Sequence, residues 1–177
     1  MSSSDLTRWS GLAAMLAGVA FLMDTWFALT MPEAAWTNVA FLVALLLMLV
    51  GLLRLHALQK DHYGRIGRVG FWSVVVGSLA HVLALIVFML GSEALVFWLA
   101  VPGYYVAIPV GLMLYGIATL QARVLPRWCG LGLIIIPPVT IFLGDPGWIL
   151  FALLWLALGY VLWSRKGTVA AQPSRVS

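Results

Sequence analysis

Three side chains that can exchange protons stand inside otherwise apolar runs of the sequence. Asp24 lies in "AGVAFLMDTWFAL", His81 in "SLAHVLALIVFML" and Tyr104 in "VPGYYVAIPV". A carboxylic acid and an imidazole can pass a proton between them, and a phenol can orient or donate to either. These three residue types together would support acid–base catalysis, so we treat Asp24, His81 and Tyr104 as candidate catalytic residues.

The composition predicts that a membrane surrounds these residues. Hydrophobic residues make up 63% of the 177-residue chain and charged residues only 9%, whereas a soluble domain has about 25% charged residues. Runs of about 20 apolar residues match the thickness of a bilayer core. We expect six such spans, at roughly 9–30, 36–57, 68–90, 95–120, 128–143 and 148–164. The prediction is an all-α integral membrane protein, with a six-helix transmembrane domain over 1–166 and a flexible cytoplasmic tail over 167–177.

The basic residues predict the orientation of this bundle. With six spans, all ten Lys and Arg residues fall on one side: Arg8, Arg54, Lys60, Arg65, Arg68, Arg123, Arg127, Arg165, Lys166 and Arg175. Positive charge marks the cytoplasmic side, so both termini are expected in the cytoplasm. Five spans would break this pattern and would require a helix through "LGDPGW". No small-x-small cleavage site follows the first apolar run, so we expect it to be a retained helix and no signal peptide.

A weak repeat predicts three parallel helical hairpins. The first, third and fifth spans begin with "RWSGL", "RVGFW" and "RWCGL". Each turn on the other side carries an acid, Glu33, Glu93 or Asp145, followed closely by a Trp. A carboxylate before a helix satisfies free N–H groups and the helix dipole, so helix capping is the simplest role for these acids. The Trp residues are typical of membrane-interface anchors.

Helical spacing brings the three candidate catalytic residues to inward faces at similar depths. Ala17, Ala20 and Asp24 share one face of the first span, and small residues on one face mark close helix packing in membranes. Similar stripes carry His81 and Tyr104. At 1.5 Å per residue, Asp24 lies about 9–10 Å below the outer boundary, and the other two lie about 14 Å below it. We therefore predict that the Asp24 and His81 side chains are either directly hydrogen-bonded or bridged by one water. The pair would be either a functional site or an interhelical hydrogen bond with a purely structural role.

Other residues extend this candidate site. Pro137 and Pro138 remove two N–H donors and are expected to bend the fifth span by more than about 20° near the same depth. Asn38 and Thr140 lie nearer the outer surface. Together with Tyr105 and Trp26 they form the predicted set of ligand-contacting residues.

Several site classes are not indicated. His56 and His62 lie near the cytoplasmic surface, far from the level of His81, which argues against paired haem ligands and a metal site. No nucleotide-binding or hydrolase motif is present, and we expect no cofactor. The net charge of +4 is explained by membrane insertion, so no nucleic-acid partner is expected. The single cysteine, Cys129, excludes an intrachain disulfide.

The stretches "LQARVLPRWCGLGL" and "LWLALGYVLW" resemble small polytopic membrane proteins of bacteria that carry an "LPRW" junction. This resemblance covers about the last third of the chain. It implies a bacterial inner (plasma) membrane and a bundle of six or seven helices, and it transfers no catalytic residue.

Three functions are compatible with these features. The first is a site that binds or acts on an apolar or lipid-like small molecule, whose enzymatic version is an acid–base isomerase or cyclase. The second is a non-catalytic accessory subunit of a larger membrane complex. The third is a proton-coupled transporter, which at this size would need to form a homo-oligomer. A cavity that holds Asp24 and His81 would favour the first function, and a filled, dry interior would favour the second.

Overall fold

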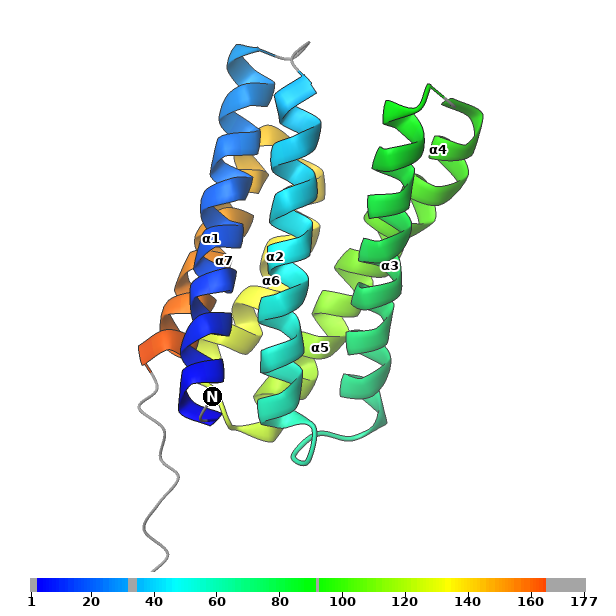
Figure 1. Cartoon of the computed structure of the whole chain (residues 1–177). Helices are drawn as coiled ribbons and strands as arrows, with labels where there is room; N and C mark the ends of the chain where they lie inside the picture. Colours follow the sequence, from blue (N-terminus) through cyan, green and yellow to red (C-terminus); the bar gives the residue numbers. More distant parts are fainter. Residues whose placement is uncertain (1–2, 32–34, 92, 165–177) are drawn as a thin grey trace, which may run out of the picture.

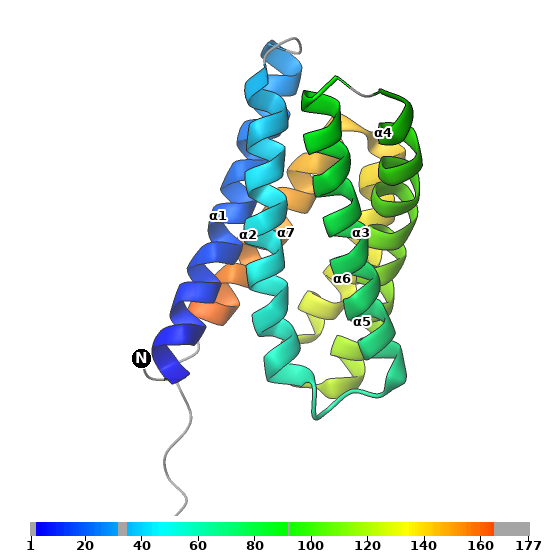
Figure 2. The same cartoon turned by 45° about the vertical axis from the view of Figure 1, so that its right-hand side comes forward.

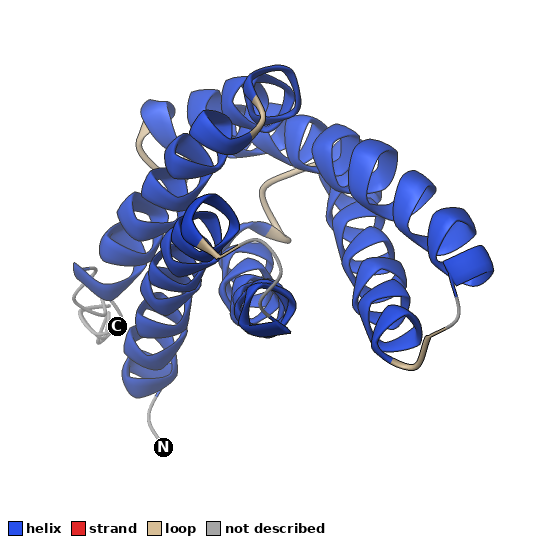
Figure 3. Cartoon of the chain, turned by 90° about the horizontal axis from the view of Figure 1, so that it is seen from above, coloured by secondary structure: helices blue, strands red, loops and turns tan. Residues whose placement is uncertain are grey.

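The structure, a computed structural model, describes residues 3–31, 35–91 and 93–164, and every regular element in these ranges is helical (Figures 1 and 3). This confirms the all-α prediction. The elements in chain order are α1 (Ser3–Thr30), α2 (Ala35–Gln59), α3 (Arg65–Met89), α4 (Glu93–Ala100), η1 (Val101–Ala107), α5 (Ile108–Ala122), α6 (Arg127–Leu143) and α7 (Asp145–Ser164).

Five helical stretches are long and apolar enough to cross a membrane, which indicates a membrane-embedded, multi-pass protein. They are Arg8–Thr30, Thr37–Gln59, Arg65–Met89, Val96–Ala122 and Asp145–Ser164. Helix α6 is also apolar but has only 17 residues. Large apolar side chains such as Val76, Leu83 and Leu153 are exposed on the outside of the bundle, as a lipid-facing surface requires.

Small residues hold the first and last helices together. The backbones of α1 and α7 approach so closely at Gly18 that an added Cβ would lie 2.6 Å from the Ala152 carbonyl oxygen, and at Gly159 it would lie 2.5 Å from the Met15 nitrogen. Helix α1 also packs along α2, while α6 joins α7 to α5, and α5 packs on α3. Helix α2 packs far less on α3 than on α1, and Figure 2 shows these two helices diverging along much of their length.

The fourth predicted span, 95–120, corresponds to the continuous helical stretch Val96–Ala122, and this stretch contains a π-helical turn that was not predicted. Helices α4 and α5 are joined by η1, in which the Ile108 N–H bonds the Gly103 carbonyl five residues back. Pro102 and Pro109 explain why α-helical bonding fails here, because neither has an N–H to donate to the carbonyl four residues earlier. Such turns occur frequently at functional sites, and this one carries Tyr104 and Tyr105.

Helix α6 continues through its two prolines. Residues Arg127–Leu143 are helical throughout, with Pro137 and Pro138 inside the helix. The Thr140 hydroxyl donates to the Ile136 carbonyl at 2.9 Å and is also 3.2 Å from the Gly147 carbonyl, so it links the end of α6 to the start of α7. The expected bend of more than about 20° stays a prediction.

The charges of the described residues separate along the bundle axis. Arg8, Lys60, Arg68, Arg123 and Arg127 lie near the end where α2 joins α3 and α5 joins α6, the lower end in Figure 1. The other end carries the turns that follow α1, α3 and α6, and the described residues place no Lys or Arg there. We call these the cationic end and the opposite end.

Candidate functional site

A pocket of about 330 Å³ lies in the half of the bundle near the opposite end, between α1, α2, α3, η1 and α7. We call it the mouth pocket. Its lining residues are Asp24, Thr25, Ala28, Thr37, Asn38, Phe41, His81, Leu85, Ala100, Tyr104, Tyr105, Asp145 and Trp148. The three candidate catalytic residues, which come from three separate parts of the sequence, therefore line one pocket. The volume lies at the small end of the range found for ligand sites, about 300–1,000 Å³.

Asp24 is the most enclosed charged group of the mouth pocket. Its side chain is 9% exposed, and it makes no hydrogen bond or ion pair with the described residues. Asp145 lies at the first turn of α7 and is close enough to Asp24 for the two carboxylate charges to repel each other. A carboxylate inside a bilayer costs about 2–3 kcal/mol even on permissive scales, and no hydrogen bond or ion pair from the described side chains offsets this cost.

Aromatic rings form the wall and floor of the mouth pocket. His81 stacks on Tyr104 with ring centroids 4.7 Å apart, and Tyr104 stacks on Trp148 at 5.6 Å. Phe41 meets His81 edge-on at 5.4 Å and Trp148 edge-on at 5.5 Å. Four helical segments, α2, α3, η1 and α7, thus contribute one continuous aromatic cluster. Offset and edge-to-face contacts of this kind stabilise the positions of the rings.

Close contact between α3 and η1 fixes the stacked pair of His81 and Tyr104. An added Cβ on Gly77 would lie 2.9 Å from the Gly103 carbonyl oxygen, and one on Gly103 would lie 2.8 Å from the Gly77 carbonyl oxygen. The Ser73 hydroxyl donates to the Ala107 carbonyl at 2.9 Å, which ties the last residue of η1 to the same helix. Glycine is required where two backbones approach this closely.

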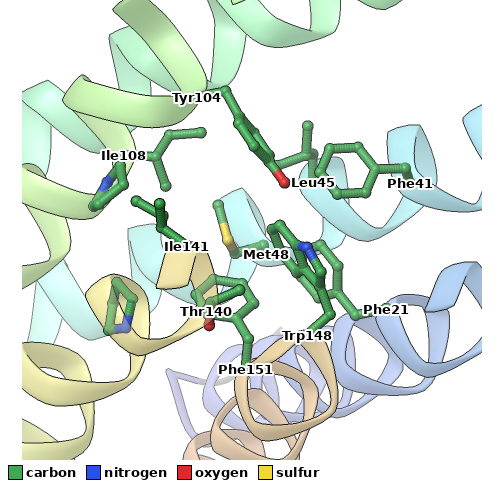
Figure 4. A pocket seen from close by; sticks show the side chains of 12 residues that line it. Phe21, Phe41, Leu45, Met48, Tyr104, Ile108, Thr140, Ile141, Trp148 and Phe151 are labelled. Carbon is green, nitrogen blue, oxygen red and sulfur yellow. The ribbon is translucent and has the colours of Figure 1, made fainter. Parts of the chain in front are cut away.

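A smaller, apolar pocket of about 30 Å³ lies beneath the aromatic floor. We call it the inner pocket. Phe41, Tyr104 and Trp148 line both pockets and therefore lie between them. Figure 4 shows side chains from different helices, Met48 and Phe151 among them, converging on the inner pocket. Its volume holds only a water or two, so of these two adjoining pockets the mouth pocket is the one with room for a ligand.

The predicted ligand-contacting residues divide between three places. Asn38 and Tyr105 line the mouth pocket. Thr140 lines the inner pocket instead, where its hydroxyl is already bonded to the backbone. Trp26 is 64% exposed and lines neither pocket, because it lies on the opposite face of α1 from Asp24.

The predicted hydrogen bond between Asp24 and His81 does not form directly. Both line the mouth pocket, but no hydrogen bond joins them, and His81 Nδ1 is buried with no partner among the described residues. The stacking on Tyr104 holds the His81 ring in place. A bridge through one water stays a prediction.

Among the members of the mouth pocket that sequence reasoning missed are two aromatic residues and one acid. Phe41 and Trp148 were not assigned to it, and Asp145 was interpreted only as a helix cap. Asp145 does lie in the first turn of α7, where a carboxylate is favoured, but it also lines the mouth pocket. Asp145 and Trp148 are one helical turn apart, and this spacing was the sequence feature that could have indicated that both face the same pocket. Glu33 and the side chain of Glu93 lie outside the described residues.

A second polar cluster, also missed, lies near the cationic end. His56 Nδ1 and the Tyr63 hydroxyl are hydrogen-bonded, and the His56 ring stacks on Phe71 with centroids 3.8 Å apart. Gln59 is fully buried, and its Nε2 is 3.5 Å from the Tyr115 hydroxyl. Burial raises the pKa of Tyr63, which lies between the spans, to about 12, although nearby Arg68 acts in the other direction. This cluster packs α2, the loop after it, α3 and α5 together.

No group of three or more His, Cys, Asp or Glu residues in the described part of the chain is arranged to hold a metal ion. Comparisons with protein-family models, with curated proteins and with solved structures found no match to this chain. The site must therefore be interpreted from its own geometry.

Proposed function

We propose that this protein is an integral membrane protein that binds a small, largely apolar molecule in the mouth pocket. The observation that carries the proposal is the meeting of Asp24, His81 and Tyr104 in one pocket large enough for a ligand. A bundle whose interior is filled by side chains would have favoured the alternative function, a non-catalytic accessory subunit. An apolar lining with a few convergent polar groups is the usual character of a small-molecule site.

An enzymatic version of this function would use Asp24 as the acid and His81 as its partner in proton transfer. The two side chains face the same space, and the unpartnered Nδ1 of His81 is free to accept a proton or a hydrogen bond from a bound molecule. Tyr104 would orient that molecule through its hydroxyl. An isomerisation or cyclisation needs this kind of proton exchange and no cofactor.

We further propose that the bundle crosses a bacterial inner membrane six times, as three helical hairpins with both termini in the cytoplasm. The pairings of α1 with α2, α3 with α5, and α6 with α7 support the hairpins. The collection of basic residues at the cationic end supports the orientation, because positive loops stay in the cytoplasm. The mouth pocket would then lie in the outer half of the membrane.

Native mass spectrometry of the purified protein tests the proposed binding function. We expect a retained small molecule on the wild type and its loss from Ala28→Trp, because Ala28 lines the mouth pocket and an indole there would fill it. Ala57→Trp is the matched control, since Ala57 is exposed on α2 near the cationic end. Equal retention by both variants would place the molecule elsewhere, and absence of any bound molecule from the wild type would count against the proposal.

A further inference from the structure

The described lining of the mouth pocket includes carboxyl groups and no positive side chain. Its charged or titratable lining residues are two carboxylates, Asp24 and Asp145, with one imidazole and two phenols. No Lys or Arg lines it, and the described basic residues lie near the cationic end of the bundle. The carboxylate of the exposed Asp145 is near enough to repel that of the buried Asp24, and like charges repel more strongly where water is partly excluded. The pocket therefore favours an occupant that carries positive charge.

Asp24 shows that this negative charge has no internal partner. Its side chain is nine-tenths buried and makes no hydrogen bond or ion pair with the described residues. Two further polar atoms at the pocket, His81 Nδ1 and Thr37 Oγ1, are buried with no hydrogen-bond partner in the described part of the chain. Buried polar groups in native proteins are nearly always satisfied. Two buried polar atoms without partners, beside the buried Asp24 side chain, indicate that the mouth pocket suits a ligand with polar or charged groups.

The aromatic lining specifies what kind of cation would fit. Phe41, Tyr104, Tyr105 and Trp148 all line the same pocket as the two carboxylates. The faces of aromatic rings attract cations, and cages of such rings bind alkylated ammonium groups. A small metal ion would instead need oxygen ligands at close range, and the pocket walls are mostly rings and aliphatic side chains.

We propose that the mouth pocket binds an organic ammonium ion with apolar substituents, and that Asp24 and Asp145 balance its charge while Phe41, Tyr104 and Trp148 hold its alkyl groups. This inference rests on the proposed small-molecule function and names the chemical class of the ligand. His81 in its neutral form adds an acceptor at Nδ1 for an N–H or O–H group of the ligand.

A pair of probes that differ only in charge tests the inference. The cation is benzyldimethyl(hydroxyethyl)ammonium, and its partner is the carbon isostere, in which a neutral quaternary carbon replaces the nitrogen. Affinities are measured by calorimetry on the full chain in a non-ionic detergent at constant ionic strength. We expect the cation to bind about tenfold more tightly than the isostere or better, which corresponds to about 1.4 kcal/mol.

Three substitutions locate the selectivity. Asp24→Asn and Asp145→Asn should each reduce the affinity for the cation by about tenfold while changing that for the isostere less than about twofold. An amide keeps the size of the carboxylate and can still form a helix cap, so both variants are expected to fold. Asp61→Asn is the matched control, because Asp61 is exposed in the loop near the cationic end, and it should leave the selectivity unchanged.

The outcomes separate the two proposals. Equal binding of cation and isostere would overturn the ammonium inference and leave the binding function standing. Failure of both probes to bind would contradict the binding function itself. Selectivity that survives both pocket substitutions would show that the charge preference arises outside the mouth pocket, and it would also overturn the inference.

Discussion

Buried polar side chains lie near both ends of this apolar helical bundle. In the mouth pocket Asp24 is buried and His81 Nδ1 has no hydrogen-bond partner among the described residues, whereas His56 and Tyr63 are bonded to each other. The contrast separates two uses of a buried polar group. The bonded pair is a packing feature with a satisfied hydrogen bond, and the unpartnered groups are available to a ligand.

The Tyr63 hydroxyl makes stability depend on pH in a defined range. Burial raises its pKa from 10.0 to about 12, so the folded state holds this proton more tightly than the unfolded state does. The contribution is fully present below pH 10.0 and is lost as the pH rises towards 12. Tyr63→Phe should lower stability by about 1 kcal/mol near pH 8 through loss of the hydrogen bond to His56, and the gap to wild type should shrink between pH 10.0 and 12.

Thermal unfolding of both proteins at a series of pH values measures this gap. Tyr160→Phe is the control, because Tyr160 is 59% exposed on α7. This substitution should leave the unfolding temperature unchanged at every pH in the series. A gap that stays constant from pH 8 to pH 12 would show that the Tyr63 proton is not held by the folded state.

At the scale of elements, the π-helical segment η1 decides the position of the aromatic cluster. It places Tyr104 against His81, and glycines at the contact with α3 allow the two backbones to meet. The span itself was predictable from its apolar length, and so were the inward stripes that carry His81 and Tyr104. The π-helical turn within this span was not predicted. Pro102 and Pro109 indicate a break in regular α-helical bonding, but two prolines in one span are compatible with either a kink or a π turn.

Gly103→Ala should disrupt this contact. The new methyl group would lie 2.8 Å from the Gly77 carbonyl oxygen, and backbone atoms cannot move aside as a flexible side chain can. Overpacking of this kind costs about 1–3 kcal/mol, and separating η1 from α3 would also unstack Tyr104 from His81. We therefore expect a lower unfolding temperature and weaker binding of the ammonium probe.

Gly64→Ala provides the comparison, since a Cβ at Gly64 would meet nothing within 4 Å. It should alter stability by less than about 0.5 kcal/mol. Wild-type stability and probe affinity in Gly103→Ala would mean that the contact between α3 and η1 does not position the site.

At the scale of the whole molecule, sequence patterns predicted local features better than distant pairings. The six apolar runs and the shared depth of Asp24, His81 and Tyr104 follow from composition and helical spacing. The packing of α1 on α7 and the weak contact between α2 and α3 do not, because apolar residues alone do not specify which helices meet in lipid. Membership of Trp148 and Asp145 in the mouth pocket depends on that arrangement, since α7 reaches Asp24 only by packing beside α1.

The orientation of the whole bundle is tested by cysteine labelling in intact bacterial cells. Asp61 is exposed in the loop near the cationic end, and Met31 is 58% exposed just after α1 near the opposite end. If positive loops stay in the cytoplasm, Met31→Cys should react with a membrane-impermeant maleimide from outside, and Asp61→Cys should react only after lysis. The native Cys129 is buried and should give no background in the parent protein. Labelling of Asp61→Cys from outside would place the cationic end outside, and it would move the mouth pocket to the cytoplasmic half of the membrane.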